Sequence, residues 1–133
     1  MPAERSRGRV AGACFAAVVL ASGYLLFAPS PPGPPLFPHA DKVVHLGLFA
    51  LLAATARWRF SASYEVLLAV LGYALGSEVV QSLVLPDRSG DPRDLAADTA
   101  GALVGRYVAG LLLARSRRRT SGPGRSARRG SPA

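Results

Sequence analysis

Acidic, histidine and amide side chains recur at helical spacing within segments that are otherwise apolar. Asp41 and His45 are four residues apart, so both lie on one face of a helix. Glu78 and Gln81 are three residues apart and share a face in the same way. Carboxylates and an imidazole bind polar ligands and transfer protons. The spacing therefore predicts that separate helices bring such groups together.

Asp94 and Asp98 form a third polar stripe, on a further helix. Its residues lie at a similar depth in the membrane to those of the first two stripes. At a rise of about 1.5 Å per residue, His45 lies roughly 6 Å below Asp41, and Asp98 lies roughly 6 Å below Asp94. Glu78 lies roughly 12 Å below the end of its helix, so three helices bring ionisable groups to one level. The candidate polar pocket comprises Asp41, Lys42, His45, Glu78, Gln81, Arg88, Asp91, Asp94 and Asp98. Beneath it, Gly101 and Gly105 form a small-xxx-small pair that predicts close packing by another helix.

Four apolar stretches must position these residues. The composition, 50% hydrophobic and 18% charged over 133 residues, is typical of a membrane protein because most of the charge lies in tails and connections. We predict an all-α, polytopic membrane protein whose four transmembrane helices span about residues 10–28, 41–57, 64–85 and 92–114. A cleaved signal peptide is the competing interpretation of the first stretch, and Pro29 after a poor cleavage site argues against it.

Basic residues predict how the helices are oriented. Residues 1–9 form a basic N-terminal tail, and residues 115–133 form an Arg-rich tail that we expect to be disordered. Twelve basic residues flank the helix ends on the side of the tails, against three on the other side. This bias predicts cytoplasmic termini (N-in, C-in), an outward-facing pocket and a multi-pass protein of the cell membrane that contacts membrane lipids. Because topology explains the net charge of +8, no nucleic-acid partner is predicted.

The polar residues form three motifs whose order is informative. They are Asp41-Lys42-x-x-His45, then Glu78-x-x-Gln81, then Arg88-x-x-Asp91-x-x-Asp94-x-x-x-Asp98-x-x-Gly101-x-x-x-Gly105. Together they resemble the VanZ-like membrane family, which is named for a teicoplanin-resistance protein. Asp98 departs from that pattern, which usually has Asn there, and adds a carboxylate. The resemblance implies a polytopic membrane protein and leaves its molecular activity open.

Three functions stay open at this point. In the first, the pocket binds a cell-envelope or glycopeptide ligand, with Lys42 and Arg88 at its anionic groups, and contributes to teicoplanin resistance. In the second, Glu78 or His45 is the general acid or base of a membrane-embedded enzyme that acts on a lipid-linked anionic substrate. In the third, the polar residues only lock the helix bundle, as helix capping would explain for Asp91.

No cofactor is predicted. The sequence has no Cys pair for zinc, no Gly-rich phosphate loop and no Ser-His-Asp set in a nucleophile-elbow context. His45, Glu78 and Asp98 are conceivable metal ligands, but the pocket holds a single histidine, so no metal site is predicted. The oligomeric state is left open.

Overall fold

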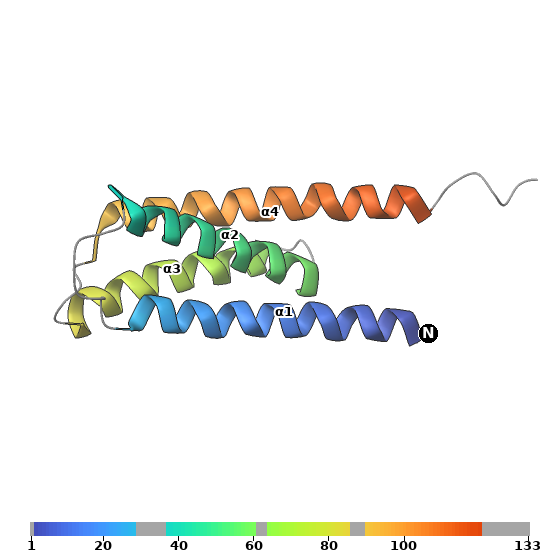
Figure 1. The fold of residues 1–133 in the computed structure, drawn as a ribbon, viewed down its shortest axis with the longest axis horizontal. Helices are drawn as coiled ribbons and strands as arrows, with labels where there is room; N and C mark the ends of the chain where they lie inside the picture. Colours follow the sequence, from blue (N-terminus) through green and yellow to red (C-terminus); the bar gives the residue numbers. More distant parts are fainter. Residues whose placement is uncertain (1, 29–36, 61–63, 86–89, 121–133) are drawn as a thin grey trace, which may run out of the picture.

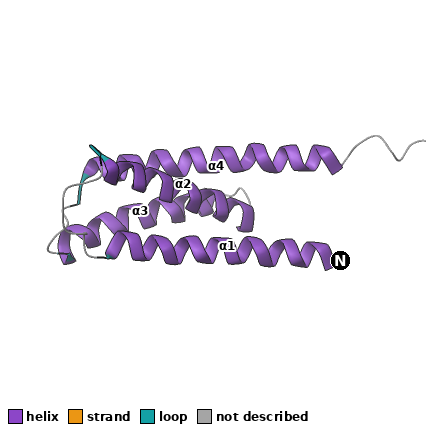
Figure 2. Ribbon diagram, viewed as in Figure 1, coloured by secondary structure: helices purple, strands orange, loops and turns teal. Residues whose placement is uncertain are grey.

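The protein is a bundle of four helices. The computed structural model describes residues 2–28, 37–60, 64–85 and 90–120. Within these ranges all regular structure is helical, as Figure 2 shows. The helices are α1 (Pro2–Phe27), α2 (Ala40–Phe60), α3 (Tyr64–Val84) and α4 (Pro92–Thr120). The prediction of an all-α chain with four helices is therefore confirmed.

Successive helices run in opposite directions, which sets the two ends of the bundle apart (Figure 1). The start of α2, the end of α3 and the start of α4 meet at one end, and we call this the polar end. The start of α1 and the end of α4 lie at the opposite end. The α2 helix packs against each of the other three, and its contact with α4 is the most extensive in the bundle. The core is built around the α2 residues Leu48, Phe49, Leu52, Ala53 and Ala56.

Two helices extend beyond their predicted limits into the basic tails. The α1 helix already begins at Pro2, and proline suits a first helical turn. The α4 helix continues through Arg115 to Thr120, six residues beyond its predicted end at residue 114. Arginine is a good helix former, and cations near a helix C-terminus interact favourably with the helix dipole. The predicted disorder of residues 121–133 concerns residues outside the described part of the chain.

Three of the helices are long and apolar enough to cross a membrane. The candidate spans are Arg5–Phe27, Ala40–Phe60 and Tyr64–Val84. Large apolar side chains such as Leu20, Leu68 and Leu83 are exposed on their surfaces, where lipid would cover them. The α4 helix is not one of the three candidates, and it carries several charged residues. A crossing by α4 and the N-in, C-in orientation therefore stay predictions.

Two glycines allow the backbones of α2 and α4 to approach closely. A Cβ atom added at Gly101 would fall on the carbonyl oxygen of Leu46, and one added at Gly105 would fall on the carbonyl oxygen of Ala50. Both positions are buried. Only residues without a side chain fit there, so this pair of glycines fixes the register of α4 on α2. That register sets which polar side chains of the two helices meet.

Candidate functional site

Three ionisable side chains from three helices meet inside the polar end. His45 of α2, Glu78 of α3 and Asp98 of α4 are only 5%, 7% and 0% exposed. His45 Nδ1 lies 2.9 Å from Asp98 Oδ1, which is a hydrogen-bond distance. Each of the three residues offers one nitrogen or oxygen atom, and these atoms lie within 4.8 Å of one another. We call this group the buried cluster.

Glu78 connects α3 to the start of α4. Its Oε2 atom accepts a hydrogen bond from the backbone N–H of Asp91 at 2.9 Å. The adjacent Gly90 lies so close to α3 that an added Cβ would be 2.9 Å from the carbonyl oxygen of Glu78. Gly90 and Asp91, just before α4, thus lie against α3. The Glu78 carboxylate binds the Asp91 amide, and Gly90 has no side chain to keep the two backbones apart.

Two carboxylate oxygens of the buried cluster have no partner. Glu78 Oε1 and Asp98 Oδ2 are buried, and neither forms a hydrogen bond within the described part of the chain. An unsatisfied buried acceptor costs about 1–3 kcal/mol, and more when the group is charged. The cluster therefore presents two oxygen atoms that would gain from a donor or a cation.

A lysine gathers three further carboxylates above the buried cluster. Lys42 Nζ lies 2.8 Å from Asp41 Oδ2, 3.0 Å from Asp91 Oδ2 and 2.8 Å from Asp94 Oδ1. We call these four residues the lysine network. The partners differ in exposure, since the side chain of Asp41 is 57% exposed and that of Asp94 only 12%. The network joins the start of α2 to the start of α4.

Asp91 caps α4 as well as contacting Lys42. Its Oδ1 atom accepts a hydrogen bond from the backbone N–H of Arg93 at 2.9 Å, which is the geometry of an N-cap. The Arg93 amide and then the Lys42 ammonium hold the pKa of the Asp91 carboxyl below its ordinary value. The capping role predicted for Asp91 is thus present alongside its contact with Lys42.

Gln81, also predicted for the pocket, contacts α1 instead of the other polar residues. Gln81 is buried, and its Nε2 atom donates a hydrogen bond at 2.8 Å to the carbonyl oxygen of Leu26, in the last turn of α1. The last carbonyl groups of a helix lack partners within the helix, so Gln81 caps α1. Arg88 lies outside the described residues. Sequence spacing placed Gln81 at the right depth but could not show that α1 competes for its amide.

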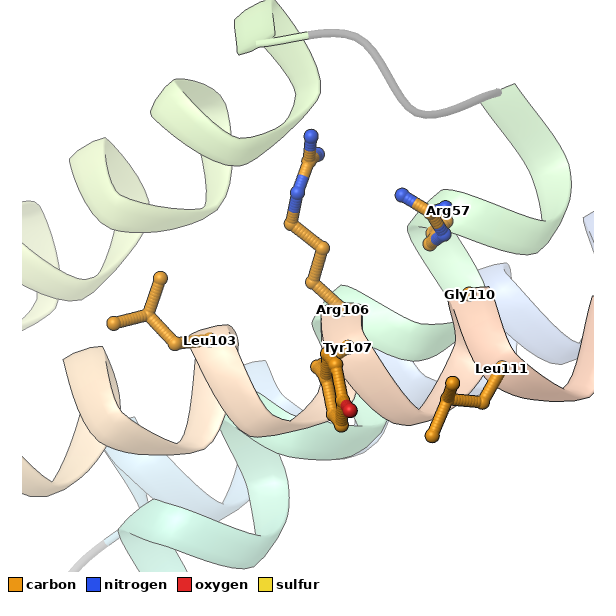
Figure 3. A pocket seen from close by; sticks show the side chains of 6 residues that line it. All are labelled: Arg57, Leu103, Arg106, Tyr107, Gly110 and Leu111. Carbon is orange, nitrogen blue, oxygen red and sulfur yellow. The ribbon is translucent and has the colours of Figure 1, made fainter.

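A second group of charged side chains lies further along the bundle, where sequence spacing gave no signal. A cavity of about 380 Å³ is lined by Arg57, Leu103, Arg106, Tyr107, Gly110 and Leu111 (Figure 3). Arg57 is twelve residues, or roughly 18 Å, along α2 from His45. The Arg106 guanidinium lies 5.9 Å from the centre of the Tyr64 ring, at the start of α3. None of these residues belongs to the buried cluster.

The buried cluster can support two kinds of chemistry. An imidazole whose Nδ1 is held by a carboxylate keeps its other nitrogen for proton transfer, as in general acid–base catalysis. An imidazole nitrogen with carboxylate oxygens is also a donor set for divalent metal ions. Both uses require groups held in place, and here three packed helices hold them.

Comparison with known proteins identifies a family. A family model described as VanZ-LLP1: VanZ/LLP1 matches residues 10–113. The matched range holds most of the 133 residues and includes the whole buried cluster and the whole lysine network. No curated protein and no solved structure matches the chain.

Proposed function

Since the chain belongs to the VanZ/LLP1 family of membrane proteins, we propose that its polar end binds a cell-envelope ligand at the outer face of the membrane. The observation that carries the proposal is the pair of unpartnered buried oxygens, Glu78 Oε1 and Asp98 Oδ2. Buried polar atoms are normally satisfied, and unsatisfied ones concentrate where a ligand supplies the partner. Hydroxyl and amide groups of a glycopeptide or of a lipid-linked precursor are donors of the required kind.

The proposed orientation follows from the distribution of charge over the two ends of the bundle. The start of α1 and the end of α4 share one end and carry Arg5, Arg7, Arg9, Arg115, Arg117, Arg118 and Arg119. A concentration of basic residues favours the cytoplasmic side. The polar end then faces outward, with both termini inside.

A membrane crossing by α4 is consistent with where its charges lie. Asp94 and Asp98 are buried against α2, where they contact Lys42 and His45. The exposed large side chains of α4 between its ends are apolar, namely Leu103, Val104, Tyr107, Val108, Leu111 and Leu112, while Arg106 is half-buried. Charged side chains within a span are tolerated when they face the bundle interior. We therefore include α4 as the fourth crossing.

A second candidate function rests on the hydrogen bond between His45 and Asp98. At 2.9 Å, the carboxylate orients the imidazole as it does in proton-transfer sites. In this alternative, His45 or Glu78 moves a proton on a lipid-linked anionic substrate. Incubation of the purified protein with an envelope-lipid extract would then yield an altered species detectable by mass spectrometry. An unchanged extract would contradict catalysis and leave binding in place.

Glu78→Gln is the test of ligand binding. Glutamine retains the size of the side chain and an acceptor for the Asp91 amide, but it removes the negative charge. Ser82→Ala is the matched control, because Ser82 is exposed one turn further along α3 and its hydroxyl donates a hydrogen bond to the carbonyl oxygen of Val79 in the same helix. Both variants are expressed in a teicoplanin-sensitive host, and their membrane levels are measured beside drug susceptibility.

We expect Glu78→Gln to lose protection at normal membrane levels, while Ser82→Ala protects as well as the original chain. Undiminished protection by Glu78→Gln would remove the buried cluster from the function. If Glu78→Gln fails to accumulate in the membrane, the buried cluster is structural and the binding proposal is wrong.

A further inference from the structure

We propose that His45, Glu78 and Asp98 form a site for one divalent transition-metal ion, Zn²⁺ or Mn²⁺, at the polar end of the bundle. The inference deepens the proposed function, since it uses the same buried cluster, but its test needs no envelope ligand. It also reverses the expectation from sequence that a single histidine makes a metal site unfavourable. What the sequence could not show is how closely the three side chains approach.

Distance is the first argument. Bonds from Zn²⁺ to histidine nitrogen and carboxylate oxygen are about 2.0–2.2 Å long, so neighbouring ligand atoms of one ion lie roughly 3–4 Å apart. His45 Nδ1 and Asp98 Oδ1 are 2.9 Å apart. One atom from each of the three residues falls within a mutual distance of 4.8 Å. An adjustment of about 1 Å would bring separations of this size into the range of ligand atoms that share one ion.

Charge is the second argument. Two carboxylates are buried within one cluster, and each has an oxygen without a partner. Uncompensated buried charge is strongly unfavourable, whereas pairing with a cation offsets the cost. Lys42 lies three residues before His45 on α2, but its ammonium contacts Asp41, Asp91 and Asp94 of the lysine network instead. A divalent ion would neutralise both carboxylates of the cluster.

The surrounding hydrogen bond is the third argument. Ligating carboxylates are commonly oriented by a further hydrogen bond from outside the metal site. The backbone N–H of Asp91 supplies such a bond to Glu78 Oε2 at 2.9 Å, which leaves Oε1 for the ion. The hydrogen bond to Oε2 thus already orients the Glu78 side chain.

The donor set selects the metal class. Imidazole suits Zn²⁺ and carboxylates suit Mn²⁺, so a set of one imidazole and two carboxylates favours these ions over Mg²⁺ or Ca²⁺, which prefer oxygen donors throughout. Three protein ligands also leave a coordination position free, as in metal sites that take up a substrate or ligand. A polar group of the envelope ligand would occupy that position.

Metal binding is measured on the full-length protein in detergent. The protein is stripped with a chelator, and Zn²⁺, Mn²⁺, Mg²⁺ or Ca²⁺ is added singly before gel filtration, elemental analysis and thermal melting. We expect about one Zn²⁺ or Mn²⁺ per chain and a higher Tm, with no comparable effect of Mg²⁺ or Ca²⁺. Loss of a residue that only hydrogen-bonds to a metal ligand typically weakens metal binding about 10- to 100-fold. Glu78→Gln and Asp98→Asn remove ligands themselves, so each should weaken binding by more than that.

Two controls keep the test decisive. Ser82→Ala should bind like the original chain, and His39→Ala excludes an exposed histidine as the source of binding. Asp98→Asn retains an oxygen acceptor for His45, so it reports on the site even if Glu78→Gln folds poorly. Circular dichroism shows whether each variant is helical.

The outcomes separate this inference from the proposed function. Absence of bound Zn²⁺ and Mn²⁺, or binding that is unchanged in both Glu78→Gln and Asp98→Asn, overturns the metal site. If protection still depends on Glu78 in that case, the proposed function survives without a metal. Conversely, metal binding that depends on Glu78 in a protein that gives no protection supports the metal site and contradicts the proposed function.

Discussion

Gly105→Ala probes the contact that positions the buried cluster. The added methyl group would fall on the backbone carbonyl of Ala50 in α2, and no side-chain rotation can relieve that overlap. Overpacking of this kind costs about 1–3 kcal/mol. The exchange of a helical glycine for alanine alone stabilises by about 0.5–1 kcal/mol. The two helices must therefore separate, and the destabilisation outweighs the gain in helix propensity.

Gly47→Ala is the matched control because it lies on α2 and its added Cβ meets nothing within 4 Å. We expect Gly47→Ala to be the more stable variant by about 1–3 kcal/mol, the cost of overpacking at Gly105, because the gain in helix propensity is common to both variants and cancels. Denaturant unfolding in detergent, followed by far-ultraviolet circular dichroism, measures the difference. Separation of the helices should also lengthen the 2.9 Å contact between His45 and Asp98.

Equal stability of Gly105→Ala and Gly47→Ala would refute this account of the helix contact. It would mean that α4 does not pack against α2 in the register described. The positions of His45 and Asp98 relative to each other would then lose their support as well.

Three further predictions concern the contacts around the buried cluster. Lys42→Met should lower the free energy of unfolding, measured with denaturant, by about 1–2 kcal/mol. This is the value of charged hydrogen bonds, reduced because the network is partly exposed. Gln81→Leu should cost about 1–3 kcal/mol, because it leaves the carbonyl of Leu26 buried without a donor, and proteolysis near the end of α1 should become faster. The Arg93 amide and Lys42 lower the pKa of Asp91, so the ionised Asp91 carboxylate stabilises the folded protein. This stabilisation is present above the ordinary carboxyl pKa near 3.9 and is lost as the pH falls through the lowered pKa. Asp91→Asn should flatten that acid limb in melting curves recorded from about pH 6 to pH 2.5; an unchanged slope would contradict the assignment.

Helical periodicity and the lengths of the apolar stretches predict most of the fold. Each of the four helices was predicted from an apolar stretch bounded by proline or basic residues, and helical rise placed His45, Glu78 and Asp98 at one depth. The structure brings these three together. The motif resemblance rested on the same residues, and the family match supports it.

The sequence could not predict how each helix is rotated toward its neighbours, or which groups compete for the same polar side chain. Periodicity gives the face of a helix but not which neighbour that face meets, so Gln81 was grouped with the pocket although its amide binds the carbonyl of Leu26. The extension of α4 to Thr120 was missed for a different reason. The arginine-rich segment lacks the apolar periodicity from which a helix is predicted, whereas arginine at the end of an existing helix prolongs it at little cost.

The two polar layers differ in what explains them. The lysine network is paired throughout and partly exposed, so joining α2 to α4 is a sufficient reason for it. The buried cluster is not explained in that way, because apolar residues of similar volume stabilise a bundle as well as or better than a buried charged group. Glu78 and Asp98 instead leave oxygens unsatisfied in the interior, which stability alone would not favour. A ligand or a metal ion that satisfies these oxygens gives the cluster a physical reason to be there.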